Sequence, residues 1–557
     1  MVESYDCVII GAGPAGTQMA YYLQKQGASY VVLEKAKQVG SFFATYPRNR
    51  RLISINKAYC GNMQEIENVR RYDWNSLLTF EEDDFKCMFR DYSDEYYPNA
   101  SKLVEYLNDF KNLFDLNIQY ETSVSKVTKT NDTFVIDYAQ GEVKDSIKTS
   151  KVFIATGLTP NHMQKLFETQ DYSKECGNFY FYDTLPMDPE VYKNKSVLII
   201  GGGNAAFETA NFVNQYCKDL TVEGAERFAY NTHYPGNIRS INMPLLDSYY
   251  LKMKVNLNWT RSKYARDDFF VNRDLKAVVD GDVFNLYDIV LCCTGFQPEL
   301  SYIDEESIQI DKSERGFPLT SPFFECVSCP SLYFIGSLSQ EHDYKKGTSA
   351  FIHGFRYNCK MAYEHLYNKQ IVKRFSSHED VSRHIMHQIN SSSALLHRFE
   401  FVGDFIFMTA SEWIYVECLP IKLIGEDAEE FDIRRFTSDP VLSIVVVYLG
   451  YNPDVKFKAS FRQPQVGSSL LHRNESVFIH PRFNVYNQMY PNQWKHVHTL
   501  ALPENALNEF KSTRLHNDVL GQFIQLMEVK AQKRNVAIDV ECLKAFDMIV
   551  SMRFLTP

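Results

Sequence analysis

The stretch that decides the fold is DCVIIGAGPAGTQMAYYLQKQGASYVVLE, residues 6–34. It opens with a short apolar run, residues 7–10, of the kind that a strand buried on both faces shows. Gly11, Gly13 and Gly16 then follow at G-x-G-x-x-G spacing, and the chain continues with helix-forming residues into a second apolar run. The order strand, glycine turn, helix, strand predicts a dinucleotide-binding βαβ unit.

Each glycine of this pattern has a physical purpose. The first permits a tight turn, the second lets the backbone approach a pyrophosphate, and the third lets the helix pack closely on the strand. The helix N-terminus then presents unpaired N–H groups and a positive dipole end to the phosphates. Glu34 ends the second strand, where a carboxylate can accept hydrogen bonds from ribose hydroxyls. An acid at this place suits an unphosphorylated ribose, as in FAD or NAD.

The same element occurs a second time. Residues 196–200 form another apolar run, and Gly201, Gly203 and Ala206 follow it at G-x-G-x-x-A spacing before a helix. One domain is therefore expected to hold one dinucleotide and a second domain to bring another to it. The ribose end leaves the second nucleotide open, because Glu223 would favour NADH and Arg227 could pair with the 2′-phosphate of NADPH.

Two further apolar strands end in the same dipeptide. Residues 151–155 lead into Thr156-Gly157, and residues 288–293 lead into Thr294-Gly295, where we expect the chain to leave and re-enter the first domain. The predicted fold class is α/β, with two Rossmann-like dinucleotide-binding domains and a C-terminal α+β domain. The expected division is a discontinuous FAD-binding domain (1–165 and 296–375), an NAD(P)H-binding domain (166–295) and a C-terminal domain (376–557).

The C-terminal region carries no nucleotide motif. Within it, residues 441–448 are predicted to form a buried strand and residues 508–533 a helix.

Composition narrows the class of protein. With 557 residues, 45% apolar and 23% charged, the chain is typical of a globular protein of several domains. A net charge of −10 argues against a nucleic-acid partner, which requires a basic surface. The chain reaches its first buried strand within six residues and its later apolar runs are short or interrupted, so we expect a cytoplasmic location and no membrane span. Composition predicts no oligomeric state.

A basic run, Tyr46-Pro47-Arg48-Asn49-Arg50-Arg51, lies one short loop after the first unit. Such a run is either a solvated face or a contact surface for phosphates or an anionic substrate, and both interpretations remain open.

Together, the two glycine motifs, the two Thr-Gly ends and Ile335-Gly336 resemble the flavin-containing monooxygenase superfamily, within the two-dinucleotide-binding flavoproteins. Segments such as DWNSLL (73–78) and FIHGFRY (351–357) resemble one branch of that superfamily, which works in the endoplasmic reticulum. That branch has a secretory signal, which we do not find here, so its location is not carried over. The F-x-G-x-x-x-H linker of Baeyer–Villiger and typical flavin monooxygenases is absent. The substrates of those enzymes are therefore not expected for this protein. Similar bacterial proteins include single-component enzymes that oxygenate or halogenate phenolic acids, which is an analogy.

The resemblance implies FAD at the first motif and NADPH at the second, with NADH as the alternative. The cofactor-binding residues that the motifs and the resemblance together indicate are Gly11, Gly13, Pro14, Ala15, Gly16, Glu34, Lys35, Ser41, Phe42, Arg51, Asn56, Val124, Thr156, Gly157, Gly201, Gly203, Asn204, Ala205, Ala206, Glu208, Arg227, Thr294, Gly295, Gly336, Ser349 and Ala350.

The implied chemistry is reduction of FAD by NAD(P)H, followed by addition of oxygen to the reduced ring as a C4a-(hydro)peroxide. Asn56 matches the place where the superfamily has an asparagine beside the flavin; the alternative is a turn residue that caps Lys57. Lys57 and Lys345 are candidate reactive amines that would capture hypohalous acid, or ordinary surface lysines. Arg48, Arg50 and His353 are candidate substrate-binding residues, which the basic run and the resemblance suggest.

The predicted function is an FAD-containing, NADPH-dependent, single-component monooxygenase of a small, aromatic or phenolic, anionic substrate, with molecular oxygen as co-substrate. The first alternative is a single-component flavin-dependent halogenase of a phenolic acid, a brominase or chlorinase that could also decarboxylate its substrate and would need a halide. The second is a thiol-redox or non-catalytic flavoprotein partner, which the C-x-x-C pair Cys326 and Cys329 suggests although it lies just before a closing strand. His496 and His498 would share a strand face without an acid or cysteine at ligand spacing, so no metal is predicted.

Overall fold

The computed structural model describes residues 3–58, 64–161, 178–224, 237–251, 257–261, 270–271, 276–279, 282–424, 432–451, 479–490, 493–502 and 520–525. The chain divides into two compact units. The N-terminal unit comprises Met1–Ala58, Trp74–Thr320 and Glu325–Arg356, and the C-terminal unit comprises Tyr59–Asp73, Ser321–Phe324 and Tyr357–Pro557. The second unit thus starts upstream of the expected boundary at residue 376 and includes a piece of the N-terminal region. The division of the first unit into an FAD and an NAD(P)H domain stays a prediction.

The first sheet has the strand order β3-β2-β1-β6-β5-β4, and β17 also pairs with β6. The pairs β1·β2, β1·β6, β2·β3 and β6·β17 are parallel, whereas β4, β5 and β6 form an antiparallel meander. The strands are β1 (Glu3–Ile10), β2 (Tyr30–Leu33), β3 (Ile118–Gln119), β4 (Thr122–Thr130), β5 (Thr133–Gln140), β6 (Val143–Ile154) and β17 (Leu332–Phe334).

Helix α1 (Pro14–Gln26) connects β1 to β2 and packs on both strands. It begins with a proline, whose fixed φ suits the first helical position. It ends at Gly27, which adopts φ 72° and donates its N–H to the Gln24 carbonyl. The residues that α1 buries include Met19, Tyr21 and Leu23, so the predicted βαβ unit is confirmed.

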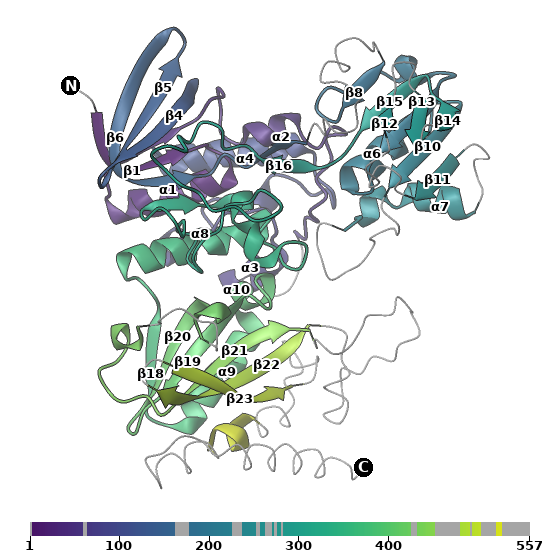
Figure 1. Ribbon diagram of the computed structural model, residues 1–557. Helices are drawn as coiled ribbons and strands as arrows, with labels where there is room; N and C mark the ends of the chain where they lie inside the picture. The colour runs from purple at the N-terminus through teal and green to yellow at the C-terminus, as the bar shows by residue number, and fades with distance from the viewer. Residues whose placement is uncertain are drawn as a thin grey trace, which may run out of the picture. The chain divides into compact units, whose positions relative to one another are not determined.

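The second sheet is entirely parallel, with the order β11-β10-β9-β15-β8. Its strands are β8 (Phe179–Phe181), β9 (Ser196–Ile200), β10 (Asp219–Gly224), β11 (Leu257–Arg261) and β15 (Ile289–Cys292). Helices α6 (Asn204–Val213) and α7 (Pro244–Tyr250) accompany it, next to a three-stranded antiparallel sheet of β12 (Phe270–Val271), β13 (Lys276–Val279) and β14 (Asp282–Leu286) (Figure 1). Both predicted Rossmann-like sheets are confirmed.

Two short strands follow the two Thr-Gly dipeptides. β7 (Leu158–Pro160) and β16 (Phe296–Pro298) pair antiparallel, so the segments by which the chain leaves and re-enters the first sheet run side by side. Helices α2 (Ser41–Thr45) and α4 (Ala100–Leu113) contact each other within the same unit. The Asn99 side chain caps α4 by accepting a hydrogen bond from Ser101 N at 2.9 Å.

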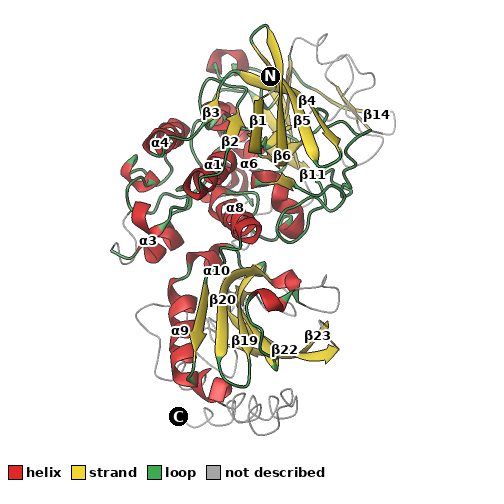
Figure 2. Cartoon of the chain, turned by 90° about the vertical axis from the view of Figure 1, so that its left-hand side faces the viewer, coloured by secondary structure: helices red, strands yellow, loops and turns green. Residues whose placement is uncertain are grey.

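The C-terminal unit is built on an antiparallel sheet with the order β18-β20-β19-β21-β22-β23. Helix α9 (His378–Ser391) covers one face of this sheet (Figure 2) and contributes Val381, Ile385 and Ile389 to its apolar core. The other elements are α3 (Ile66–Tyr72), the part of α8 (Ile352–Tyr367) from Tyr357 onward, α10 (Ser393–His397), β18 (Val372–Phe375), β19 (Val402–Met408), β20 (Trp413–Pro420), β21 (Ser443–Gly450), β22 (His480–Tyr490) and β23 (Gln493–Ala501). The predicted α+β class is confirmed.

Of the helix expected at 508–533, only residues 520–525 are described, and these are helical; the remainder lies outside the described residues. No helix in the described part of the chain is long and apolar enough to cross a bilayer.

Candidate dinucleotide-binding active site

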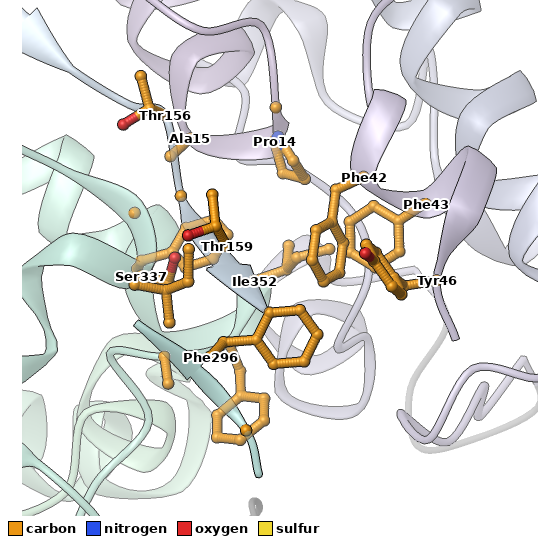
Figure 3. Close-up of a pocket in the computed structure, with 18 of the residues that line it drawn as sticks. Pro14, Ala15, Phe42, Phe43, Tyr46, Thr156, Thr159, Phe296, Ser337 and Ile352 are labelled. Atoms are coloured by element: carbon orange, nitrogen blue, oxygen red, sulfur yellow. The ribbon is translucent and has the colours of Figure 1, made fainter. Parts of the chain in front are cut away.

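One cavity of about 1090 Å³ lies in the N-terminal unit (Figure 3). Its lining includes residues of both glycine motifs. Single ligand pockets usually span roughly 300–1,000 Å³, so the space is large enough for more than one bound molecule. The predicted residues that line it are Gly11, Gly13, Pro14, Ala15, Glu34, Lys35, Ser41, Phe42, Val124, Thr156, Gly157, Gly201, Gly203, Asn204, Ala205, Glu208, Thr294, Gly295, Gly336, Lys345, Ala350 and His353. The fold thus brings together predicted residues that are far apart in the chain.

Two glycines of the first motif are required by the fold itself. Gly11 adopts φ +100°, and a Cβ there would lie 2.7 Å from the Ala155 carbonyl oxygen. A Cβ on Gly16 would collide with the Gly11 carbonyl oxygen. These residues allow β1, its turn and α1 to pack against β6.

Gly13 is different, because nothing in the fold requires a glycine there. Its backbone is extended, with φ −70° and ψ −179°, and a Cβ would meet no heavy atom within 4 Å. The open space lies in front of the N-terminus of α1, where a helix presents unpaired N–H groups. A side chain would fill this space, so the residue fits a motif that leaves room for a phosphate.

Glu34 is buried at the end of β2 and lines the same cavity. One carboxylate oxygen accepts a hydrogen bond from Ala12 N at 2.6 Å, and the other accepts from Ala36 N at 2.9 Å and Ser41 Oγ at 3.3 Å. A carboxylate has about four acceptor positions, so capacity remains for a ribose hydroxyl.

The second motif repeats this division of roles. Gly201 adopts φ +144°, and a Cβ there would collide with the Cys293 carbonyl oxygen. Gly203 has an extended backbone and open space around its Cβ position, as Gly13 has. The N-terminus of α6 therefore offers a second place for a phosphate.

The register between β9 and β10 corrects the prediction that Glu223 could contact the ribose of the second nucleotide. Gly11 N donates to the Leu33 carbonyl at 2.9 Å, and Gly201 N donates to the Glu223 carbonyl at 2.8 Å. Glu223 is therefore the counterpart of Leu33, and Gly224 is the counterpart of Glu34. Since alternate side chains of a strand point to opposite faces, Glu223 cannot take the role of Glu34. Arg227, the other candidate at this end, lies outside the described residues.

Aromatic side chains form one wall of the cavity. Figure 3 shows Phe42, Phe43 and Tyr46 next to one another and facing Phe296. Tyr46 stacks on Tyr182 with a centroid distance of 5.6 Å and contacts Phe296 edge-on at 5.4 Å. We call these five residues the aromatic wall; it offers flat apolar surface to a ring.

Glu208 of α6 connects that helix to Tyr182 of the aromatic wall and to the loop that follows Tyr46. It accepts hydrogen bonds from Arg48 N at 3.0 Å and from Tyr182 Oη at 2.5 Å. Burial raises the pKa of Glu208 to about 7, although these hydrogen bonds oppose the rise. This predicted cofactor residue therefore also has a structural partner in the loop.

Several predicted residues are not among those that line the cavity. The Arg48 guanidinium donates to the Leu185 carbonyl at 2.8 Å, and Arg51 pairs with Glu95 at 2.6 Å. The Asn56 amide donates to the Ser93 carbonyl at 2.5 Å, and the Lys57 ammonium lies over the Trp74 ring at 5.1 Å. Arg50, Ser349, Gly16 and Ala206 are likewise absent from the lining. Their proposed direct roles stay predictions that this geometry does not support.

The lining residues that were not predicted from the sequence include Trp74 and Arg239. Trp74 stacks on His353 with a centroid distance of 4.7 Å, and Arg239 lies with its guanidinium carbon 5.5 Å from the Trp74 ring centroid. Trp74 belongs to the segment DWNSLL, whose resemblance to related flavoproteins could have pointed to it. No motif near Arg239 in the sequence indicates a role in the site.

The C-x-x-C pair lies away from the cavity. Cys326 and Cys329 are buried in the same apolar core as Leu332 and Phe334 of β17 and do not line the cavity. Burial raises the pKa of the Cys329 thiol above its ordinary value. Cys293 does line the cavity, but burial raises its pKa to about 12, which keeps it protonated. The described residues include no cluster of three or more potential metal ligands among His, Cys, Asp and Glu.

A family model described as pyridine nucleotide-disulphide oxidoreductase matches residues 8–336, more than half of the chain. The chain belongs to this family. That places it among the flavin-dependent oxidoreductases, with FAD and NAD(P)H as the cofactors that the family implies.

Individual relatives show which members of the superfamily this chain is similar to. The chain is 32% identical over 469 residues to the FAD-dependent oxidoreductase domain-containing protein 2 of Mus musculus, covering 76% of this chain and 67% of that protein. This is the branch that the sequence segments resemble, so that recognition is confirmed. The chain is also 23% identical to the flavin-containing monooxygenase FMO GS-OX-like 3 of Arabidopsis thaliana, over 60% of this chain and 71% of that protein.

A solved structure with the same fold is the flavin-containing monooxygenase from Stenotrophomonas maltophilia. It covers 66% of this chain and 99% of its own, with 18% identity and a TM-score of 0.51. At this identity the similarity concerns the fold of the region it covers.

Proposed function

We propose that the protein is an FAD-containing, NADPH-dependent, single-component monooxygenase of a small, aromatic, anionic substrate. The observation that carries this proposal is that both glycine motifs and the aromatic wall line one cavity. Two dinucleotides could therefore meet there without a separate reductase subunit. The names of the relatives from Mus musculus and Arabidopsis thaliana, an FAD-dependent oxidoreductase and a flavin-containing monooxygenase, agree with it.

The first motif suits FAD. Gly13 leaves room for a pyrophosphate at the N-terminus of α1, and Glu34 can accept a hydrogen bond from an unphosphorylated ribose. When bound, FAD would take electrons from the nicotinamide and deliver them to molecular oxygen. The chain's own contribution is to orient the two nucleotides and to exclude water with the aromatic wall.

The second motif suits NADPH better than NADH. Gly224 stands where the first motif has Glu34, so no carboxylate occupies that strand position to repel a 2′-phosphate. Arg227 would add a positive charge at the same end, and its role remains part of the proposal.

The thiol-redox alternative is not favoured. A dithiol that exchanges electrons with a flavin must face it, and both Cys326 and Cys329 lie in an apolar core outside the cavity. Oxygenation and halogenation would share the same cofactors, so we treat the halogenase as an outcome of the experiment below.

The experiment is aerobic turnover of the purified protein with NADPH and a panel of aromatic acids, in parallel with and without bromide. Mass spectrometry reads the products, and an oxygen electrode reads oxygen consumption. We expect a product heavier by one oxygen atom, labelled when ¹⁸O₂ is supplied. Bromide-dependent products would identify the halogenase, and NADPH-dependent reduction of a disulfide without oxygen consumption would identify the thiol-redox enzyme.

A further inference from the structure

Cationic side chains in the cavity wall differ in whether they already have a partner. Those that line it are Lys35, Arg239, Arg315 and Lys345. Arg315 is exposed and pairs with Glu341 at 3.0 Å, and the two lysines are also exposed. Arg239 is half-buried and has no carboxylate partner among the described residues. Among the described residues of this wall, Arg239 is therefore the half-buried cation that no described carboxylate neutralises.

The position of Arg239 is fixed by the protein. Asn204, the first residue of α6, accepts hydrogen bonds from Arg239 N at 2.9 Å and from Asn242 Nδ2 at 3.0 Å. Its own Nδ2 donates to the Asn237 carbonyl at 2.9 Å. The loop that carries Arg239 is thus fastened to the start of α6, and Asn204 uses its side chain for this purpose.

The Trp74 ring lies beside the Arg239 guanidinium and begins a series of stacked rings. The central carbon of the guanidinium is 5.5 Å from the centroid of Trp74, within the range of a cation–π contact. Trp74 stacks on His353, and His353 in turn lies near-parallel to Phe351 at 5.8 Å. Trp74, His353 and Phe351 all line the cavity. Burial lowers the pKa of the guanidinium below its ordinary value, and an arginine stays charged at neutral pH even so.

We propose that Arg239, together with Trp74 and His353, is the anion-recognising end of the substrate site and binds the carboxylate of an aromatic acid. The planar guanidinium can donate two parallel hydrogen bonds to a carboxylate, and the neighbouring rings can pack on the ring of the same ligand. This inference rests on the proposed function and moves substrate recognition from Arg48 and Arg50 to a residue that faces the cavity.

The same guanidinium chemistry would suit a phosphate of NADPH, because Arg239 is tethered beside the N-terminus of α6. Both ligands are anions and differ only in their source. Separate measurements of binding of an aromatic acid and of NADPH therefore distinguish them.

The test uses the full-length flavin-loaded protein with benzoate and benzamide as probes, because the two differ in charge but hardly in shape. Equilibrium dialysis measures both affinities in the wild type, Arg239→Met, Arg239→Lys and the control Arg315→Met. In Arg239→Met we expect benzoate affinity to fall about 10- to 100-fold, because a charge-assisted pair is lost, while benzamide affinity changes less than about 2-fold. Arg239→Lys should recover part of the benzoate affinity, and Arg315→Met should leave it within about 2-fold.

NADPH affinity is measured on the same variants by anaerobic flavin reduction. The proposal predicts an unchanged dependence on NADPH concentration in Arg239→Met. A loss confined to NADPH would assign Arg239 to the nucleotide phosphate and overturn the proposal. Equal losses for benzoate and benzamide, no loss for either, or no benzoate binding by the wild type would overturn it as well. Because binding is measured without turnover, failure of the monooxygenase proposal would leave this result readable.

Discussion

The two glycine motifs of this protein have the same backbone and different chemistry. In each, the first glycine is forced by a carbonyl of a neighbouring strand end, Ala155 in one case and Cys293 in the other. In each, the second glycine faces open space. The motifs differ after the second strand, where one has Glu34 and the other Gly224. The glycine turn therefore serves the fold, and we propose that the residue after the second strand selects the ribose.

The helices of the two motifs differ at a second corresponding position. Gln18 of α1 holds a distant segment by donating to the Leu78 carbonyl at 2.9 Å and accepting from Leu78 N at 2.6 Å. Glu208 of α6, which stands at the same distance from its first glycine, accepts from Arg48 N instead. Gln18 makes its contact with a neutral amide and Glu208 with a buried acid, so only the contact of Glu208 can depend on pH.

The largest expected effect concerns the third motif position. Gly16→Ala should lower the free energy of unfolding by about 3 kcal/mol or more, because its Cβ would collide with the Gly11 carbonyl oxygen. Ala206→Gly, at the corresponding place in α6, should cost only about 1 kcal/mol of helix stability. Chemical denaturation followed by circular dichroism measures both. Equal losses in the two variants would show that the motifs are not built differently here.

The second prediction separates ligand from fold. Gly13→Val should lose flavin, with affinity for FAD lowered about 100-fold, because the side chain would overlap a bound pyrophosphate. Its thermal stability without flavin should stay close to that of the flavin-free wild type, since nothing surrounds the new side chain. The matched variant Gly203→Val should keep its flavin absorbance. A yellow Gly13→Val protein would contradict the assignment of the first motif.

The third prediction tests the strand end. Gly224→Glu places a carboxylate where the first motif has Glu34, and should shift the preference from NADPH toward NADH by about 10- to 100-fold, because like charges repel. Stopped-flow reduction by each nucleotide measures the ratio. The control Glu223→Gln should leave the ratio unchanged, and a shift in the control instead would mean that the register argument is wrong.

The smallest expected effect is on pH dependence. Because the pKa of Glu208 rises from 4.5 to about 7 on folding, its contribution to stability is full below pH 4.5 and is lost as the pH rises to 7. Glu208→Gln gives α6 the same amide that α1 has in Gln18. Across that window the free energy of unfolding of the wild type should fall by an amount on the order of 1–2 kcal/mol, and this fall should be absent from the variant. Denaturation at several pH values between 4.5 and 7.5 measures it. An unchanged slope in the variant would assign the pH dependence to other groups.

The sequence predicted the parts of the site that have local signals. Glycine spacing, apolar runs and Thr-Gly ends lie within short segments, so the two sheets could be predicted, and most of the residues predicted to bind cofactors line the cavity. The charge run 46–51 pointed to the cavity by proximity in the chain, but Arg48 and Arg51 find protein partners instead. Trp74 and Arg239 meet only through tertiary structure, which no local pattern encodes.

The placing of Glu223 at the second ribose end shows a second limit of prediction from the sequence. Spacing alone locates the end of a strand only to within a residue or two, and a shift by one residue moves a side chain to the other face. The hydrogen bond from Gly201 N to the Glu223 carbonyl fixes that register, and this bond belongs to the folded sheet.

The most direct test of the central claim, that both nucleotides meet in one cavity, is anaerobic mixing of the flavin-loaded protein with NADPH in a stopped-flow spectrometer. The wild type should lose the absorbance of its oxidised flavin in a single turnover, because the nicotinamide delivers a hydride to the flavin. Gly203→Val should stay oxidised while retaining its flavin. Reduction of Gly203→Val at the wild-type rate would contradict the claim, because the second motif would then have no part in bringing NADPH to the flavin.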